Sequence, residues 1–282
     1  MTTATPTLLV PVGDSNFEVH RAGPVSAAQR TTALLLHGFP QSAASWHAVA
    51  QHLSAFGITS YAPNQRGYSA GARHHPVEAY RLSELVADVV GLCDALALDT
   101  VHLVGHDWGA IVAWATAAHH PDRVTSLTAV SVPHPAAFAR AIGTDPEQQE
   151  MSAYLGLLEQ DGTADLLLTN DAAALRLGYG DALTRETADA HIRLLSEPGA
   201  MSAALNWYRA RGTSWHEVPP VTVPTTFVWG ADDMAVSRSA AYGCAEHVTA
   251  PYEFVELAAT GHWVPEQEPA RLSTAIIHRI VG

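Results

Sequence analysis

The sequence predicts an α/β protein with a mostly parallel central sheet flanked by helices, and two observations carry that prediction. Short apolar runs closed by Gly or Pro recur along the chain, and such runs are typical of strands buried on both faces. Helical patterns lie between them, and an alternation of this kind builds βαβ units. The strand-like runs are Ala33–Leu36, Ile58–Ala62, Val101–Val104, Val124–Val132, Thr225–Trp229 and Tyr252–Leu257.

The clearest helical pattern covers residues 82–96. Its apolar positions recur at intervals of three and four residues, which places them on one face of a helix. Cys93 belongs to that face, and we expect it to pack as a small buried hydrophobe. The apolar positions are Leu82, Leu85, Val86, Val89, Val90, Cys93 and Leu96.

Residues 135–216 interrupt the alternation, because the strand signal stops there and helical patterns follow one another. These patterns break at Gly143, Gly162, Gly178 and Gly199. Ligands of open α/β sheets bind outside the carboxyl ends of the strands, and an inserted helical block would lie there as a cap. We therefore expect a core formed by residues 1–134 and 217–282, and a helical cap over residues 135–216.

The composition excludes several classes of protein. An apolar fraction of 48% with 15% charged residues does not fit a disordered chain or a coiled coil. The formal net charge of −13 argues against nucleic acid and membranes as partners, because nucleic acid and anionic membranes attract basic patches. Cys93 and Cys244 are too few for a disulfide framework. Since no signal peptide or spanning segment is evident, we expect a cytoplasmic protein. We also expect it to be a monomer or a homodimer.

Residues 105–109 read Gly-His-Asp-Trp-Gly between a strand-like run and an apolar helical stretch. A strand, a Gly-x-Asp-x-Gly turn and a helix is the layout of a nucleophile elbow, with Asp in the usual place of Ser. The two glycines permit a tight turn and a close approach of strand and helix. Asp107 would then stand at a helix N-terminus, whose partial positive charge favours an ionised carboxylate. The alternative is a capping Asp at an ordinary turn.

With this turn, the whole chain resembles the α/β-hydrolase fold superfamily, in the branch with an Asp nucleophile, and most of all the soluble epoxide hydrolases. Three further motifs carry the resemblance, in the chain order of that fold. They are His37-Gly38-Phe39-Pro40, Trp229-Gly230-Ala231-Asp232-Asp233 and Gly261-His262-Trp263. The resemblance implies that the backbone N–H groups of Phe39 and Trp108 form an oxyanion hole. It also implies that Asp233 is the catalytic acid partner and that His262 is the base.

The nucleophile type constrains the reaction. A carboxylate that attacks an sp³ carbon forms an ester, which water and a His can cleave, whereas a serine would form a stable ether. Attack of a carboxylate on an ordinary ester carbonyl would give a reactive anhydride, which is an uphill step. Asp107 therefore predicts substitution at carbon through a covalent intermediate, which water activated by His262 and Asp233 then hydrolyses. This route requires no cofactor.

Two tyrosines of the expected cap distinguish epoxide from halide chemistry. An opening epoxide leaves an alkoxide, for which a Tyr hydroxyl is a suitable proton donor. The segment Leu205-Asn206-Trp207-Tyr208-Arg209 resembles the epoxide-hydrolase segment that carries one oxirane-binding Tyr, which implies that role for Tyr208. Met151-Ser152-Ala153-Tyr154 resembles the second such segment less fully, so Tyr154 is the candidate there and Tyr179 is the reserve.

The substrate expected from these motifs is a small, largely apolar molecule. Phe39, Trp108 and Trp207 would supply apolar walls, and His37 and Trp263 stand next to catalytic motif residues, so all five are candidate substrate-binding residues. Haloalkane dehalogenation by the same ester route, ester or lactone hydrolysis, and non-catalytic ligand binding are the alternatives.

Two other features are given no catalytic role. Adjacent His pairs such as His74-His75 point apart on a strand and do not share a helix face, so we expect no metal site. The segment Asn64-Gln65-Arg66-Gly67 departs from the family, which usually has Asp at its first position. We expect Arg66 to hold neighbouring loops by hydrogen bonds.

Overall fold

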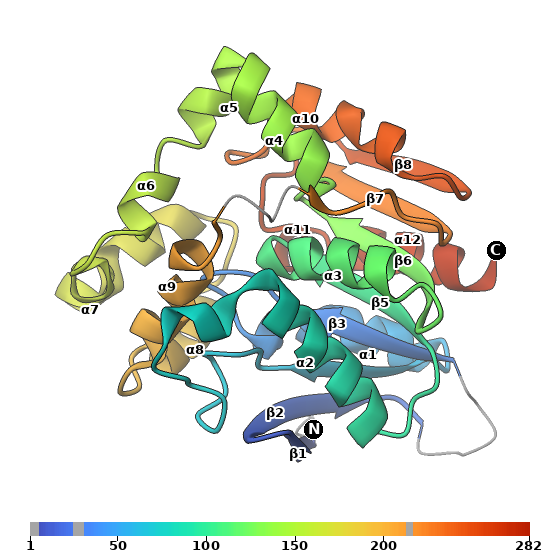
Figure 1. Cartoon of the computed structure of the whole chain (residues 1–282), viewed down its shortest axis with the longest axis horizontal. Coiled ribbons are helices and arrows are strands. Elements are labelled where there is room, and N and C mark those ends of the chain that lie inside the picture. The colour runs from blue at the N-terminus through green and yellow to red at the C-terminus, as the bar shows by residue number, and fades with distance from the viewer. Residues whose placement is uncertain (1–5, 25–30, 213–216) are drawn as a thin grey trace.

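The computed structural model describes residues 6–24, 31–212 and 217–282, and its centre is an eight-stranded sheet (Figure 1). The strand order is β1-β2-β4-β3-β5-β6-β7-β8. β2 pairs antiparallel with both β1 and β4, and the pairs from β4 to β8 are parallel. The strands are β1 (Thr7–Val12), β2 (Ser15–Ala22), β3 (Thr32–Leu36), β4 (Thr59–Pro63), β5 (Val101–His106), β6 (Val124–Val130), β7 (Thr225–Gly230) and β8 (Tyr252–Leu257).

All six strands expected from apolar runs are present, and the mostly parallel α/β architecture is confirmed. The hairpin of β1 and β2 is an addition to the prediction. In β2, buried residues such as Phe17 and Val19 alternate with more exposed ones, and the apolar run of β1, Leu8–Val10, is short and includes the exposed Leu9. Gly13 and Asp14 join the two strands, with Gly13 at φ +58°, and a Gly-Asp pair between alternating segments is a hairpin signal.

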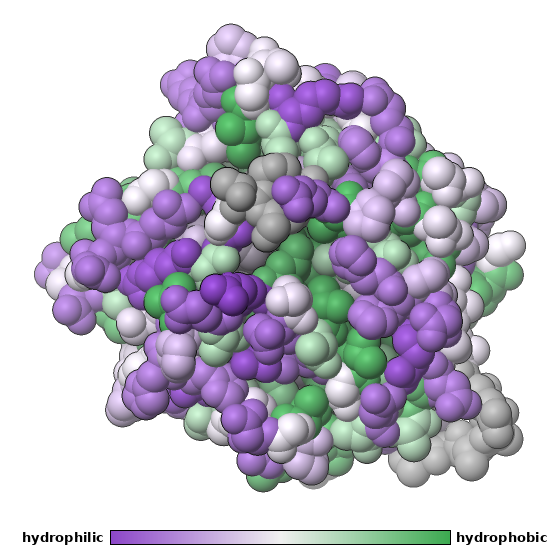
Figure 2. Space-filling model, in the orientation of Figure 1, coloured by the Kyte–Doolittle hydropathy of each residue, from purple (hydrophilic) through white to green (hydrophobic). Residues whose placement is uncertain are grey.

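Helices cover both faces of the sheet (Figure 1). Neighbouring residues of β3 enter different layers, because Leu34 packs with α2 and α3 whereas Leu35 packs with α1 and α12. On the face drawn in Figure 2, hydrophilic side chains cover most of the surface, and a narrower hydrophobic strip runs down its middle. The helices of these layers are α1 (His47–Ala55), α2 (Leu82–Ala95), α3 (Trp108–His119), α10 (Arg238–Tyr242), α11 (Val264–Gln267) and α12 (Pro269–Val281), with 3₁₀ turns η1 (Ala43–Trp46), η2 (Val77–Tyr80) and η4 (Gly243–His247).

Helix α2 matches the predicted amphipathic pattern, and Cys93 on its inner face is only 2% exposed. The same face carries Asp88, which accepts two hydrogen bonds from Arg66, at 2.6 Å from Nε and 2.5 Å from Nη2. Both side chains are about nine-tenths buried. Arg66 therefore ties the loop after β4 to α2, and the expected structural role of this residue is confirmed.

The described chain between β6 and β7 contains helices α4 to α9, and α6 to α9 lie together at the left of Figure 1. Gly162 and Gly199, both with positive φ, precede α7 and α9 as expected. The breaks expected at Gly143 and Gly178 are displaced by one residue, because α4 ends at Thr144 and α7 ends at Tyr179. An added Cβ at either glycine would meet open space. The helices are α4 (Pro135–Thr144), α5 (Pro146–Met151), α6 (Leu155–Leu158), α7 (Thr163–Tyr179, with non-helical residues at 169–172), α8 (Arg185–Leu195) and α9 (Ala200–Arg209).

Candidate active site

Asp107 occupies a strained turn between β5 and α3, with φ 53° and ψ −121°. Glycine is required on both sides of this turn. A Cβ at Gly105 would collide with the backbone of Gly109, and a Cβ at Gly109 would collide with the carbonyl oxygen of Leu36. The close approach of β5, α3 and the end of β3 therefore presents the Asp107 side chain alone at the edge of the sheet, in the predicted elbow layout.

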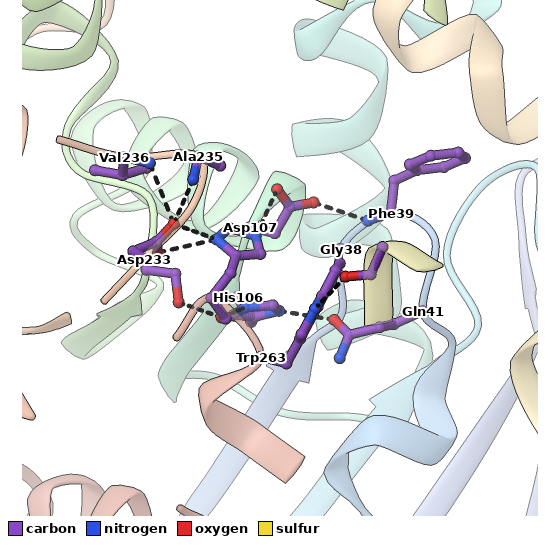
Figure 3. Close-up of polar contacts among 12 residues, drawn as sticks. Gly38, Phe39, Gln41, His106, Asp107, Asp233, Ala235, Val236 and Trp263 are labelled. Atoms are coloured by element: carbon purple, nitrogen blue, oxygen red, sulfur yellow. Dashed lines mark hydrogen bonds and ion pairs between the residues drawn. The ribbon is translucent and has the colours of Figure 1, made fainter. Parts of the chain in front are cut away.

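The Asp107 carboxylate is held by backbone N–H groups. Phe39 donates its N–H to Oδ1 at 2.8 Å (Figure 3). The N–H of Trp108 also bonds the carboxylate. Gly38 allows this approach, because a Cβ there would overlap the carboxylate. Burial alone would raise the pKa of Asp107, but His262, His106 and the Trp108 N–H outweigh it and lower that pKa. Asp107 is therefore ionised at neutral pH.

His262 lies between two carboxylates. Its Nδ1 is 3.0 and 2.9 Å from the two oxygens of Asp233, and its Nε2 is 3.5 Å from Oδ2 of Asp107. Asp233 in turn accepts the N–H groups of Ala235 at 2.8 Å and Val236 at 3.1 Å, as Figure 3 also shows. These bonds fix Asp233, and Asp233 orients the imidazole so that Nε2 faces Asp107.

The charge of this arrangement changes the acid strength of His262. Burial would lower the pKa of its imidazole, but the carboxylates of Asp233 and Asp107 raise the pKa to about 10. In the resting site, His262 is therefore an imidazolium between two carboxylates.

Two cavities of unequal size meet at Asp107. The larger has a volume of about 290 Å³ and the smaller about 30 Å³. Asp107, Tyr154, Tyr208 and Ala235 border both of them. The larger cavity is also lined by Phe39, Pro40, Leu157, Leu158, Leu167, Ala174, Leu175, Gly178, Met234, His262 and Trp263, and the smaller by Trp108, Ile111, Val132, Phe138, Leu155, Arg211 and Val236.

The two predicted tyrosines face the carboxylate from two separate parts of residues 135–209. Tyr208 of α9 is 4% exposed, with its ring packed edge-on against Phe39 and Trp108. Tyr154, just before α6, is 44% exposed as a residue, but its phenol oxygen lies in a buried setting. Burial and the nearby negative charge of Asp107 raise the pKa of both phenols, so both hydroxyls keep their protons.

The reserve candidate Tyr179 has a different partner. Its hydroxyl donates to the carbonyl oxygen of Pro40 at 2.8 Å, and the residue lines neither cavity. Among the three tyrosines, Tyr154 and Tyr208 are therefore the pair that the fold brings to Asp107.

The five residues expected to bind substrate divide into two groups. Phe39, Trp108 and Trp263 line one or other cavity. His37 and Trp207 line neither cavity. Both residues are fully buried, and their ring nitrogens are hydrogen-bonded to backbone groups. Trp207 donates to the carbonyl of Arg66 at 3.0 Å, and His37 accepts the N–H of Gln65 at 3.1 Å. The expectation for His37 and Trp207 is thus corrected, because both stand behind the cavity walls.

Sequence reasoning missed a buried polar cluster behind the elbow. His106 contacts Gln41 at 2.8 Å and the carbonyl of His262 at 2.8 Å, and Gln41 contacts Glu266 at 2.5 Å (Figure 3 shows the first of these). Glu266 also lies 3.5 Å from His191 of α8. Only His106 carried a sequence signal, as a neighbour of the elbow Asp. The other members come from distant segments, and no spacing relates them.

Two kinds of feature are absent from the part of the chain that the structure describes. No group of three or more His, Cys, Asp or Glu side chains among them is arranged to hold a metal ion. No helix in residues 6–24, 31–212 and 217–282 is long and apolar enough to cross a membrane.

Comparisons with known proteins agree with this geometry. Residues 33–269 match the family model of the alpha/beta hydrolase fold. Epoxide hydrolase A of Mycobacterium tuberculosis is 30% identical, with 88% of this chain and 90% of that protein covered. The AB hydrolase superfamily protein YfhM of Bacillus subtilis is 32% identical, with 86% and 88% covered. A solved structure among novel epoxide hydrolases from metagenomes of hot environments superposes with a TM-score of 0.88 at 27% identity, over 99% and 100% of the two chains. The chain therefore belongs to the α/β-hydrolase fold family, and within that family it is similar to epoxide hydrolases.

Proposed function

We propose that this chain hydrolyses epoxides to vicinal diols through a covalent ester on Asp107. One observation carries the proposal. An ionised Asp107, with Oδ1 held by the N–H of Phe39, lies between a protonated His262 and two tyrosines at the wall of an apolar cavity. The names of the relatives and of the structural neighbour support the same substrate class.

In the first step, the free oxygen of Asp107 attacks one carbon of the epoxide. A bond forms between that oxygen and the carbon, and the ring C–O bond breaks. The leaving oxygen stays on the substrate as an alkoxide, which takes a proton from Tyr154 or Tyr208. Since both hydroxyls are protonated in the resting site, either can act as the donor. The imidazolium of His262 then returns a proton to the tyrosinate, through water, and becomes neutral.

In the second step, water hydrolyses the ester. Nε2 of His262 takes a proton from water, and the hydroxide forms a bond to the carboxyl carbon of Asp107. The negative charge develops on Oδ1, which already accepts the Phe39 N–H at 2.8 Å. When the ester C–O bond breaks, the diol oxygen takes the proton of the new Asp107 carboxyl group. The cycle ends as it began, with Asp107 ionised and His262 protonated.

The charge of Asp107 switches His262 between these two steps. While Asp107 is ionised, it helps to raise the pKa of His262 to about 10. The ester has no charge, so the pKa of His262 falls once the ester forms. His262 then becomes a base that is free of its proton near neutral pH, where general bases are most effective.

The setting of Trp108 favours an epoxide over a haloalkane. A departing halide needs free N–H donors beside the nucleophile. The Trp108 side chain instead bonds the Tyr208 hydroxyl, which helps to orient that hydroxyl. An epoxide oxygen that leaves toward Tyr208 fits this arrangement.

The test is to trap the ester in a His262→Gln variant, where the second step should stall. The variant is incubated with a panel of epoxides and haloalkanes, and the intact protein mass is recorded. We expect an added mass equal to a whole epoxide, and no adduct in the matched His262→Gln, Asp107→Ala double variant. A mass equal to a haloalkane less its hydrogen halide would assign the chain to dehalogenation. A folded variant without any adduct would refute the ester route.

The tyrosines have their own test. Replacing Tyr154 and Tyr208 together by Phe removes both proton donors while keeping both rings. We expect turnover of epoxides to fall by at least about a hundredfold, the usual contribution of a positioned general acid. Undiminished turnover in the double variant would refute their role.

We further propose a cytoplasmic protein, acting on a largely apolar small molecule as a monomer or homodimer. Two free, buried cysteines are in keeping with a reducing compartment. Fractionation of the native host cells tests the location, and light scattering of the purified protein tests the oligomeric state.

A further inference from the structure

We infer that the preferred epoxide carries one bulky apolar group, and at most a methyl-sized group on the other ring carbon. This inference rests on the proposed epoxide hydrolysis. Asp107, Tyr154 and Tyr208 border both cavities. An oxirane held between this carboxylate and the two hydroxyls therefore directs the substituents of its two carbons into different cavities.

The volumes of the cavities set the size of each substituent. An apolar cavity of about 150 Å³ holds benzene, so the larger cavity, at about 290 Å³, accepts an aromatic ring or a branched alkyl group with room to spare. The smaller cavity, at about 30 Å³, has space for little more than a water molecule or a methyl group.

The two cavities also differ in their walls. Ile111, Val132 and Phe138 of the smaller cavity are each less than a tenth exposed. Because they are closely packed, these side chains cannot move aside to make room for a larger substituent. The larger cavity is bordered by Leu157 and Met234, which are 43% and 59% exposed. A long apolar group in the larger cavity can therefore extend along these side chains, whereas Ile111, Val132 and Phe138 close the inner end of the smaller cavity.

The wild-type protein tests this inference with styrene oxide, which has one phenyl group, and trans-stilbene oxide, which has a phenyl group on each carbon. We expect kcat/KM for stilbene oxide to be at least about a hundredfold lower, because one missing or extra methylene in a pocket already changes rates by about tenfold or more. A Phe138→Ala variant should reduce this discrimination at least tenfold. The matched Leu157→Ala change in the larger cavity should leave the ratio of the two kcat/KM values within about twofold of wild type.

Equal rates with the two epoxides would overturn the inference while the proposed function stood. The same holds for a folded Phe138→Ala variant with unchanged discrimination. If the protein turned over neither of these two epoxides nor any other epoxide, the proposed function would be overturned, and the inference with it.

A different observation carries a second proposal, and this one does not depend on the identity of the substrate. We propose that Glu266 is a positioning residue that stays protonated and donates into a one-way chain of hydrogen bonds ending on the backbone carbonyl of His262. The chain passes through Gln41 and His106, and the side chains of all three residues are at least nine-tenths buried. This chain of hydrogen bonds would hold the loop that carries His262 against the turn that carries Asp107.

Counting donors and acceptors gives the direction of this chain. The carbonyl of His262 can only accept, so Nε2 of His106 carries a proton. The amide oxygen of Gln41 lies 2.8 Å from Nδ1 of His106. A neutral His106 has a bare Nδ1 there, which needs a donor, so we infer that the Gln41 amide is turned over, with its –NH₂ group toward His106. The turned amide brings its oxygen to the place of Nε2, which lies 2.5 Å from Oε1 of Glu266, and this oxygen must then receive the proton of the Glu266 carboxyl group.

The opposite direction would need an imidazolium at His106. Burial and the neighbouring His262 lower the pKa of His106 to about 4, against the smaller opposing effect of Asp107 and Asp233. Burial also raises the pKa of Glu266, which faces His191 and Tyr179. His191 accepts the Ser42 N–H at 3.1 Å on Nδ1, so its Nε2 carries a proton toward Glu266. With Glu266 protonated, each link from Glu266 to the carbonyl of His262 has one donor and one acceptor, while Oε2 of Glu266 and Nε2 of His191 make no hydrogen bond.

The test compares Glu266→Gln, whose amide still donates toward Gln41, with Glu266→Leu, which donates nothing. We expect Glu266→Gln to keep kcat within about twofold of wild type, and Glu266→Leu to lose about tenfold in kcat with little change in KM. Side-chain ¹⁵N spectra, with His106→Asn for assignment, should find a bare Nδ1 and a protonated Nε2 at His106 in wild type and in Glu266→Gln. An imidazolium at His106 near neutral pH, or equal damage by the two Glu266 variants, would overturn the proposal.

Discussion

Removing the charge of Asp107 should lower the pKa of His262 to a value suited to a base. Asp107→Asn keeps the shape of the side chain and removes its charge, as esterification does. Two unit charges 3.5 Å apart, the distance between the two side chains, interact by about 5 kcal/mol at an effective dielectric constant of about 20. That energy equals about 3.5 pKa units. The pKa of His262 should therefore fall from about 10 to about 6.5.

The measurement is an NMR titration of the imidazole protons of His262, assigned with the His262→Gln variant, from about pH 5 to about pH 11. Asp232→Asn is the matched control. Asp232 is the exposed neighbour of Asp233 in the same turn, so its neutralisation should leave the pKa of His262 almost unchanged. Steady-state kinetics add a second reading, since kcat of the wild-type protein should rise with pH through about 6.5 if ester hydrolysis limits turnover.

A pKa of His262 that stays near 10 in Asp107→Asn would refute the reasoning. The charge of Asp107 would then have no part in raising that pKa, and the switch between the two steps would lose its cause. Asp233, with both oxygens within 3.0 Å of Nδ1, would have to account for the whole effect.

Three further predictions concern stability. Asp88→Ala leaves the buried Arg66 charge without its partner and should lower the free energy of unfolding, measured with urea, by about 3–5 kcal/mol. A decrease below about 1 kcal/mol would contradict a buried ion pair of Arg66 and Asp88. Gly109→Ala drives a Cβ into the backbone at the end of β3, so melting should fall sharply or folding fail, whereas Gly143→Ala, with open space around it, should be neutral or slightly stabilising. The raised pKa of His262 stabilises the fold fully below about pH 6.5, and this contribution disappears as pH rises through about 10. Urea unfolding over that range should detect the decline in wild type and a weaker one in His262→Gln.

The sequence alone was enough for the parallel core and the elbow. Strands buried on both faces are continuous apolar runs, so local composition marks β3 to β8 without knowledge of their neighbours. Gly105 and Gly109 flank Asp107 because the turn has no room for a Cβ, and a steric requirement of this kind is visible in the residues themselves.

Contacts between distant segments were decided by the tertiary structure. Which tyrosines face Asp107 depends on how the helices after β6 pack, and it is packing that gives Tyr179 a bond to Pro40 instead. The same holds for Trp207, an apolar residue that fills the space behind the cavity wall. Periodicity reports that such residues are buried, but not which neighbours they meet.

The buried cluster behind the elbow is the clearest case of this division. Gln41, His106 and Glu266 lie far apart in the chain, and no spacing joins them. They meet because the sheet order places β3 beside β5, and because α11 brings Glu266 against the loop that follows β3. The sequence determined the chemical groups of the site, since each motif carries its own residues. Strand order and helix packing determined which of those groups share protons, because a hydrogen bond acts only over the distance that folding closes.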